Sequence, residues 1–481
     1  MSGPRTPPAR VDLLIQNGVV IPMDSTRTIL YDGALAVADG RIVAMGSTDQ
    51  LVGRYVADKT INAQHKAVLP GLIDTHHHFL QNLLKGSRDD LAFVDWIDHV
   101  SSPRIVLAVQ DYLAGNSALQ VYATRLGCIE ALKSGITCIL NMEWATPPDV
   151  IQVYEEIGIR AVHVLTMTDV DQWQKSGMLL SQPAALDLAD QLIARCKESV
   201  GGRVTFRYGP ACENSASPEL LRQTRELAYL NQVGIHIHMA ESKFGWDNIH
   251  QMYGKTPVGY LHDIGLLGRD VLGAHAIWLS DEDIQILSET GTCVSYNPEC
   301  HMKIALGIAP VVKMLQAGVT LSLGTDTCAV NDNMDLFEAM RVGAMLQKLA
   351  TMDPAAMHAY QALEMATIGG AKALGMENDI GSLEVGKRAD LILVDLTGVH
   401  MRPINHIVNN LVYCATAASD VETVIVDGQV VVEERRLLSF DEQAAIAEAE
   451  EFALSRFAQA DLELSPYYHQ AVLDPASRWP S

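Results

Sequence analysis

Two histidines separated by one residue are the first feature of the sequence that could perform chemistry. His76 and His78 lie in PGLIDTHHHF, after a run of apolar residues typical of a buried strand. Residues two apart on an extended strand point to the same side, so both imidazoles can reach one ion while His77 points away. An HxH pair alone is a weak signal. Lone histidines inside apolar runs, such as His163 and His236, are usually hydrogen-bonded core residues.

Three further apolar segments also end in side chains that can bind a metal. VGIHIHMAES ends with His238 and, three residues later, Glu241; VLGAHAIW contains His275; and TLSLGTDT ends near Asp326. Imidazole and carboxylate suit zinc and comparable divalent ions, and a catalytic site leaves one position open for water. The matching placement of these side chains in separate segments favours a shared site over unrelated core positions.

The elements that must position these residues alternate regularly. From about residue 65, apolar strand-like segments alternate with amphipathic helical segments, several of which end in glycine, a helix C-cap signal. Eight such units over roughly 300 residues have the size of a (β/α)₈ TIM barrel, whose active-site residues stand at the C-terminal strand ends. A doubly wound open sheet gives similar alternation. The strand candidates are AVLPGLID, GITCILNM, IRAVHVLTM, RVTFRYGP, VGIHIHMA, DVLGAHAI, GTCVSYNP and GVTLSLGTD.

Both ends of the chain are rich in short strand-like segments with NG and DG turn signals. The simplest account is one small β domain made from both ends, with the barrel inserted between them. We therefore expect an α/β protein with a composite β-sandwich domain at residues 1–64 and 377–440. A metal-binding TIM barrel would comprise residues 65–376, and an amphipathic terminal helix and tail residues 441–481.

The composition limits the class of partner. The 481 residues are 48% hydrophobic and 19% charged, and the formal net charge of −23 opposes binding to nucleic acids or anionic membranes. The eight cysteines are scattered without a CxxC pair, as in a reduced cytoplasmic protein. No stretch approaches the ~20 apolar residues of a membrane helix, and no secretory signal is evident. We expect a cytoplasmic protein that binds a small molecule.

Taken together, the motifs resemble those of the amidohydrolase superfamily. The segments that carry the resemblance are PGLIDTHHHF, HMAES, the AH of LGAHA, LGTD and GKRADLILVD. Within the superfamily, the chain looks like the branch of triazine hydrolases, S-adenosylhomocysteine/methylthioadenosine deaminases and 8-oxoguanine deaminases. The likeness covers nearly the whole chain, and it implies a barrel flanked by a composite β-sandwich and assembly into a homo-oligomer.

The resemblance also implies roles for individual residues. Glu241 would shuttle a proton, and His275 would position the water or the substrate. Binuclear relatives have a carboxylated lysine at the end of strand four, where this chain reads RVTFRYGP, so a single ion is expected. The implied ligands of that divalent ion, zinc or alternatively iron, are His76, His78, His238 and Asp326.

This set of residues suits hydrolysis by activated water. A bound divalent ion lowers the pKa of water towards neutrality. Asp326 would accept the proton of the water, and His275 would steady the nucleophile. Glu241 would then protonate a ring nitrogen or the leaving amine. We expect a metal-dependent amidohydrolase that deaminates a small aromatic N-heterocycle of the purine, pterin or triazine type.

The sequence indicates the substrate less clearly than it indicates the reaction. Adenosine-type deaminases of this branch usually have a ribose-binding Glu in a W-P-x-E element, and this chain has Ile105 at the corresponding position. They also have a His in an S-P-H-S-P element, where this chain has Tyr208. Both differences argue against a nucleoside substrate. Gln81 in HHHxxQ matches relatives acting on free bases and triazines, since an amide can donate and accept together, but it equally fits a solvated helix start. Glu299 in NPECHM is atypical and has no assigned role. The candidate substrate contacts are Gln81, Trp96, Tyr208 and His301.

Several rival functions remain open at this point. The same scaffold could release chloride or an alkylamine from a triazine, or deaminate S-adenosylhomocysteine or methylthioadenosine. A cyclic-amide hydrolase is disfavoured because the bridging lysine is absent. A non-catalytic scaffold protein would be expected to have lost metal ligands, and none of the implied ligands is missing.

Overall fold

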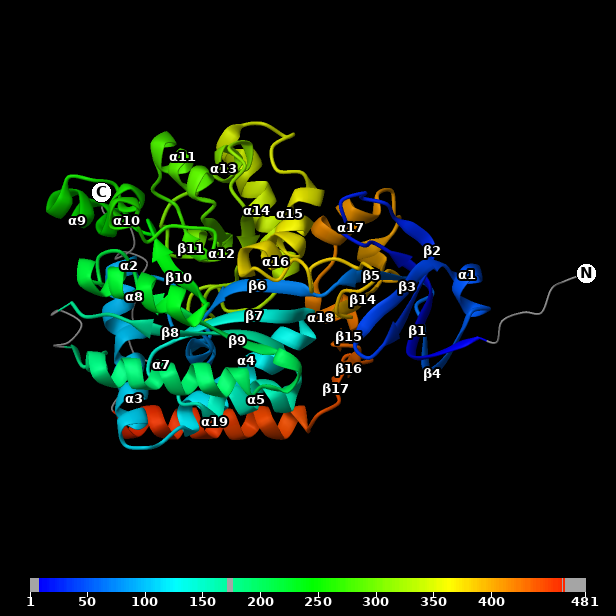
Figure 1. The fold of residues 1–481 in the computed structure, drawn as a ribbon, viewed down its shortest axis with the longest axis horizontal. Helices are drawn as coiled ribbons and strands as arrows, with labels where there is room; N and C mark the ends of the chain where they lie inside the picture. The colour runs from blue at the N-terminus through cyan, green and yellow to red at the C-terminus, as the bar shows by residue number, and fades with distance from the viewer. Residues whose placement is uncertain (1–7, 171–175, 461, 463–481) are drawn as a thin grey trace, which may run out of the picture.

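The computed structural model describes residues 8–170, 176–460 and 462. Their strands form two sheets that lie side by side along the long axis of the molecule (Figure 1). One is an eight-stranded parallel sheet wrapped by helices. The other is a mixed sheet built from both ends of the chain.

The parallel sheet is the predicted barrel. Each strand pairs with the next in sequence order, from β6 to β13. An isolated parallel bridge between His77 and Asp326 joins the last strand to the first, so the barrel closes at the predicted ligand Asp326 and between His76 and His78. The strands are β6 (Leu72–His77), β7 (Ile136–Glu143), β8 (Arg160–Met167), β9 (Val204–Pro210), β10 (Gly234–Met239), β11 (Val271–His275), β12 (Cys293–Tyr296) and β13 (Leu321–Leu323).

Helices cover the outside of the barrel (Figure 1). Their boundaries follow the expected capping signals: α5 ends at Gly158 and α11 at Gly291, both in the left-handed conformation, and Ser280 caps the start of α11. The helices between barrel strands are α2 (Phe93–Trp96), α3 (Ser102–Leu113), α4 (Ala118–Lys133), α5 (Asp149–Ile157), α7 (Gln182–Lys197), α8 (Pro218–Asn231), α9 (Lys243–Tyr253), α10 (Pro257–Ile264), α11 (Asp281–Thr290), α12 (Pro298–Lys303) and α13 (Val311–Gln316). Further helices follow β13 as α14 (Leu336–Thr351), α15 (Ala359–Met365) and α16 (Ile368–Leu374), and short helical turns are η1 (Phe79–Leu84), η2 (Ile97–Ser101) and η3 (Val200–Gly202).

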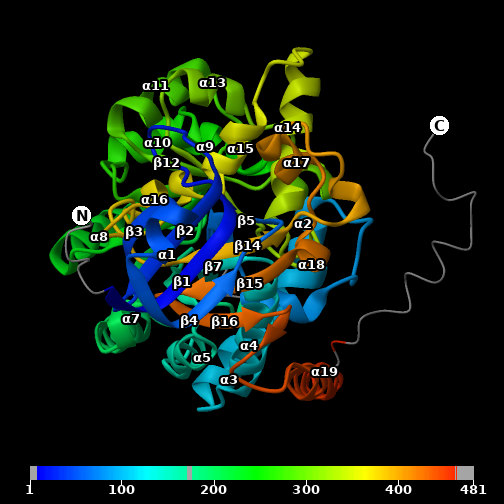
Figure 2. The same ribbon diagram turned by 90° about the vertical axis from the view of Figure 1, so that its right-hand side faces the viewer.

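The second sheet confirms that the two chain ends build one β unit. Strand β14 pairs antiparallel with β5, with Leu391 opposite Pro70, and so joins the C-terminal strands to the N-terminal ones. Figure 2 shows these strands gathered on the face towards the viewer. The strands are β1 (Ala9–Val20), β2 (Leu30–Ala38), β3 (Arg41–Ser47), β4 (Tyr55–Asn62), β5 (Lys66–Pro70), β14 (Leu391–Asp395), β15 (Val421–Val426), β16 (Gln429–Glu433) and β17 (Arg436–Leu437), with short helices α1 (Thr48–Val52), η4 (Val399–Met401), α17 (Ile407–Tyr413) and α18 (Ala417–Asp420).

The segment AVLPGLID, predicted as one barrel strand, is two strands. Residues up to Pro70 belong to the mixed sheet, and the barrel strand begins at Leu72. Gly71 lies between them, and a Cβ at this position would meet Thr137 Oγ1 at 2.0 Å. The chain therefore crosses from one sheet to the other at a close contact that only glycine permits. The domain limits given above stay predictions.

The predicted terminal helix is α19 (Glu442–Gln459), and it packs on the barrel helices beside α3 and α4 (Figure 1). Arg456 forms an ion pair with Asp111 of α3 at 2.6 Å, and Lys133 of α4 pairs with Glu442 at 2.5 Å. Most of the predicted tail lies outside the described residues. Among the helices that the structure describes, none has the length and apolar content needed to cross a membrane.

Candidate active site

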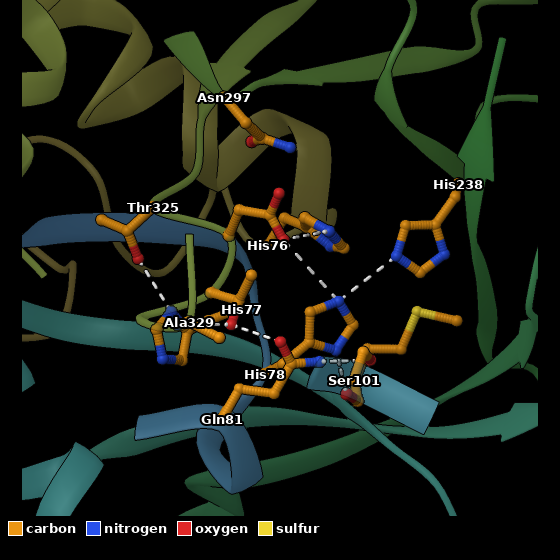
Figure 3. Close-up of polar contacts among 12 residues, drawn as sticks. His76, His77, His78, Gln81, Ser101, His238, Asn297, Thr325 and Ala329 are labelled. Carbon is orange, nitrogen blue, oxygen red and sulfur yellow. Dashed lines mark hydrogen bonds and ion pairs between the residues drawn. The ribbon is translucent and has the colours of Figure 1, made fainter. Parts of the chain in front are cut away.

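The strand ends bring the four predicted metal ligands together. His76 Nε2 lies 3.4 Å from Asp326 Oδ1, and His78 Nε2 lies 3.2 Å from His238 Nε2. Figure 3 shows the imidazoles of these histidines pointing towards one another. Two overlapping groups of side chains could each hold an ion, with ligand atoms within 4.8 Å of one another: His76, His78 and His238; and His76, His275 and Asp326.

Backbone geometry fixes the carboxylate to the first barrel strand. Asp326 N donates to His76 O at 2.8 Å, and His78 N donates to Asp326 O at 3.1 Å. Asp326 and His275 both adopt left-handed backbone conformations, with φ of 61° and 77°. Residues other than glycine rarely adopt this conformation, and such strain is concentrated at functional sites, where the surrounding structure maintains it.

Hydrogen bonds to backbone carbonyls set the tautomers of two rings. His78 Nδ1 donates to Met142 O and His238 Nδ1 donates to Ala211 O, each at 2.6 Å. A carbonyl can only accept, so both hydrogens are on Nδ1 in the neutral rings and both Nε2 atoms carry lone pairs. Burial, and then the neighbouring His76 and His238, lowers the pKa of His78 well below its usual range, which keeps that ring neutral.

These facing lone pairs test whether the site fits a metal ion. Two Nε2 lone pairs 3.2 Å apart repel each other unless a cation lies between them, and ligand nitrogens reach zinc at about 2.0–2.1 Å. His76 Nε2 is also buried without a hydrogen-bond partner among the described residues. The donor set of imidazoles and one carboxylate is that of a divalent transition-metal site. The residues present therefore fit the ion.

Neighbouring polar groups orient the remaining parts of the site. His76 Nδ1 lies 2.8 Å from His236 Nε2, so His236, expected as a hydrogen-bonded core residue, bonds to a candidate ligand. His77 faces away from the centre and bonds to Thr325 Oγ1 at 2.9 Å, as Figure 3 shows. Asp74, which the sequence interpretation missed, accepts from His76 N and Thr325 N. Burial raises the pKa of Asp74 to about 7.

The two residues predicted to act on water and substrate lie beside the candidate ligands. His275 Nε2 is 3.5 Å from Glu241 Oε1. Burial, followed by the nearby His76 and His301, lowers the pKa of His275 well below its usual range, so this ring is neutral. Burial, followed by Asp326 and Glu213, raises the pKa of Glu241 well above its usual range. The shift favours the protonated form of the Glu241 carboxyl.

A cavity of about 190 Å³ opens above this centre. His78, His238, Glu241 and Asp326 line it, together with the predicted contact residues Gln81 and Trp96. The larger apolar side chains of its wall are Phe93, Ile97, Ile105, Met178, Phe244 and Ile304. A buried centre beneath a largely apolar wall suits a flat heterocycle that must be shielded from water.

Gln81 is buried rather than solvated, with an exposed fraction of 3%. Its Oε1 accepts a hydrogen bond from Thr327 Oγ1 at 2.5 Å, and its Nε2 donates to Ser101 Oγ at 3.4 Å (Figure 3). The second hydrogen of the Gln81 amide nitrogen is therefore left to donate to a ligand.

Two predicted substrate contacts lie elsewhere. The Tyr208 hydroxyl accepts from Asn231 Nδ2 of α8 at 3.1 Å, and it is absent from the described lining of the cavity. Side chains alternate along a strand, so Tyr208 packs outward against the helix layer. His301 Nε2 lies 3.1 Å from His275 Nδ1, behind that ring. Its contact is with a candidate catalytic residue, whereas Cys300, its neighbour, lines the cavity.

Other lining residues were not predicted from the sequence. Trp144 stacks on His78, with ring centroids 5.7 Å apart. Glu213 follows β9, and burial raises its pKa to about 7. Both residues lie within three positions of the end of a barrel strand, and that position was searched only for metal-binding residue types.

Comparisons with known proteins agree with this geometry. A sequence model of the amidohydrolase family matches residues 67–431. A 5'-deoxyadenosine deaminase of Methanosarcina barkeri is 38% identical over 92% of this chain and 98% of its own length. A 5-methylthioadenosine/S-adenosylhomocysteine deaminase of Syntrophomonas wolfei is likewise 38% identical over 92% of this chain and 98% of its own. The crystal structure of an adenosine deaminase from Xanthomonas campestris with bound zinc superimposes with a TM-score of 0.87, at 29% identity, over 94% of this chain and all of that one.

Proposed function

The chain belongs to the amidohydrolase family, and from that premise we propose that it is a metal-dependent deaminase of purines, with adenine nucleosides as the first substrates to test. The observation that carries the proposal is the pair of facing Nε2 atoms of His78 and His238, in the same cavity lining as the carboxyl of Glu241. Together they provide a cation site and a general acid at the floor of one cavity.

Under this proposal, one zinc ion is held by His76, His78, His238 and Asp326. Zinc is supported by the imidazole-rich donor set and by the zinc bound in the Xanthomonas campestris adenosine deaminase. When bound, a divalent ion supplies a Lewis acid that makes water nucleophilic at neutral pH. A single ion is favoured because β9 offers no lysine to bridge a second one.

The reaction adds water across the C–N bond and releases ammonia, leaving a carbonyl in place of the amino group. Asp326 accepts a proton from the attacking water, and the neutral ring of His275 holds that water in place. Glu241 donates its proton to the ring nitrogen beside the reacting carbon. The proton that Asp326 took from water then passes to the departing amine, and the apolar wall excludes competing water.

Adenine nucleosides are favoured by the two deaminase relatives and by the zinc-containing adenosine deaminase. The sequence argument against nucleosides rested on Ile105 and Tyr208. Tyr208 packs outside the cavity, so its identity gives no information about the substrate. Loss of chloride or an alkylamine from a triazine is the rival reaction, because the water-activating residues are the same for both.

The same proposal assigns the enzyme to the cytoplasm, as a homo-oligomer without nucleic-acid or membrane partners. It is supported by the net charge of −23 and by eight cysteines that all remain unpaired. Sedimentation of the purified protein would give its oligomeric state directly.

The test is an ammonia-release screen of adenosine, 5'-deoxyadenosine, methylthioadenosine, adenine, guanine, a pterin and an aminotriazine, with metal content measured on the same preparation. We expect ammonia from at least one adenine nucleoside and close to one zinc per chain. Chloride release from a chlorotriazine without ammonia from any purine would contradict the proposal, as would activity that survives complete removal of the metal.

A further inference from the structure

A second buried carboxyl lines the cavity, and the catalytic steps above do not use it. Glu213 is 4% exposed. Its Oε1 accepts a hydrogen bond from Ala240 N at 3.2 Å. Its Oε2 is buried and has no hydrogen-bond partner among the residues that the structure describes. An unpaired buried acceptor costs free energy, so a ligand donor that bonds to this oxygen would be stabilised.

The described residues of the cavity wall limit which groups could bond to Glu213. In the part of the chain that the structure describes, no lysine or arginine lines the cavity. Asp98, another carboxyl of the wall, is exposed, so water can satisfy it. The polar side chains of the described wall, among them Gln81 and Ser242, do not bond to Oε2. An N–H or O–H group of the ligand can supply this partner.

The proposed substrate has few groups that can donate a hydrogen bond to Glu213. This step rests on the proposed function. In an adenine nucleoside, the pyridine-type ring nitrogens only accept hydrogen bonds. The amino group is the leaving group and must lie at the metal centre. The remaining donors are the sugar hydroxyls. The named substrate of the Methanosarcina barkeri relative lacks the 5' hydroxyl, which leaves the 2' and 3' hydroxyls.

We propose that Glu213 is a specificity-determining residue that accepts a hydrogen bond from the 2' or 3' hydroxyl of a ribonucleoside through Oε2. Ala240 N holds the other oxygen, and Ala240 directly precedes Glu241. The carboxyl that recognises the sugar and the carboxyl that protonates the ring are thus fixed to the same end of β10. A ribonucleoside satisfies both groups at once, whereas free adenine has no sugar hydroxyl to donate to Glu213.

The experiment measures kcat/KM for adenosine, 2'-deoxyadenosine, 3'-deoxyadenosine and adenine with the wild type, Glu213→Gln and Glu299→Gln. For the wild type, removal of the recognised hydroxyl should lower kcat/KM by about 10- to 100-fold, mainly through KM. Glu213→Gln should lose a similar factor on adenosine and show little further loss on the deoxynucleoside. Glu299 is a partly buried carboxyl outside the described cavity lining, so Glu299→Gln should keep wild-type discrimination.

Equal wild-type kcat/KM on adenosine and both deoxynucleosides would overturn the inference, even if Glu213→Gln fails to fold. An equal loss on all substrates in Glu213→Gln would also overturn it, because that pattern indicates a role in folding or in the chemical step. Preference for adenine over adenosine would refute sugar recognition while leaving a purine deaminase intact. Absence of ammonia from every purine would instead contradict the proposed function.

Discussion

At the scale of single residues, the site depends on which nitrogen of each imidazole carries the hydrogen. The HxH spacing predicted that His76 and His78 would share a centre, because strand alternation follows from backbone geometry alone. The carbonyl partners, Met142 O and Ala211 O, could not be predicted, because backbone groups carry no sequence signature. The same strand geometry points Tyr208 outward to Asn231 and brings the rings of the HxH pair together, because a shift of one residue along a strand reverses the face.

Glu241→Gln tests the general acid. A glutamine keeps the size of the side chain but cannot donate a proton to the ring, so kcat should fall about 10²- to 10⁴-fold. Metal content should stay at the wild-type value, because Glu241 is not among the proposed ligands. Steady-state kinetics and elemental analysis of one preparation measure both quantities. A rate close to that of the wild type would remove Glu241 from the mechanism.

His236→Ala tests the partner that orients His76. Loss of the 2.8 Å hydrogen bond frees the His76 ring, so metal affinity should fall about 10- to 100-fold. Competition with a chelator of known affinity provides the measurement. His163 is also a fully buried histidine of a barrel strand, but it bonds to Tyr154, so His163→Ala is the matched control. Equal affinity in the two variants would contradict the assigned role of His236.

At the scale of elements, short strands and tight crossings position the site. The alternation of strands and helices predicted all eight barrel strands, since each is an apolar run between helical segments. The division of the first one at Gly71 could not be read from the pattern, because both halves are buried and apolar. The GTD motif after β13 could be recognised in the sequence. Its pairing with β6 could not, because this pairing is a bridge between His77 and Asp326, which are far apart in the chain.

Gly324→Ala tests that closure. A Cβ at Gly324 would lie 2.5 Å from Asn297 Oδ1 and 2.9 Å from His76 Cβ, so β6 and β13 must move apart. We expect lower metal occupancy and a melting temperature reduced by several degrees. Gly53→Ala is the control, since a Cβ there meets nothing within 4 Å. Unchanged metal occupancy and melting temperature in Gly324→Ala would show that the contact is not restrictive.

At the scale of the whole molecule, the mixed sheet built from both chain ends and the C-terminal helix α19 cover different sides of the barrel. The mixed sheet covers one end, and α19 lies along the helix layer (Figure 1). The β-rich ends and the amphipathic helix were predicted from composition and periodicity. The short helices α17 and α18 were not, since each is too brief to show a period.

Glu299 should make the free energy of unfolding depend on pH. Burial, and then Glu338, raises the pKa of Glu299 from 4.5 to about 8. Between these values the folded chain holds a proton that the unfolded chain has released, so the free energy of unfolding falls as the pH rises from about 4.5 to 8. Glutamine has no such proton. Relative to the wild type, Glu299→Gln should therefore be more stable at pH 8.5 than at pH 5, by roughly 4 kcal/mol.

Denaturant unfolding of both proteins at the two pH values measures this difference. All other titrating groups are shared, so their contributions cancel in the comparison. Identical pH dependence of the two unfolding free energies would show that Glu299 is ionised in the folded protein.

X-ray absorption at the metal edge of the purified protein tests the central claim most directly, because it reports the atoms bound to the ion. We predict zinc with three imidazole nitrogens and carboxylate or water oxygen, all at about 2.0–2.2 Å. Cys300 lies in the same cavity lining, so sulfur at about 2.3 Å is the alternative that this measurement distinguishes. A spectrum with sulfur ligands, or a protein purified without chelators that retains no metal, would contradict the account.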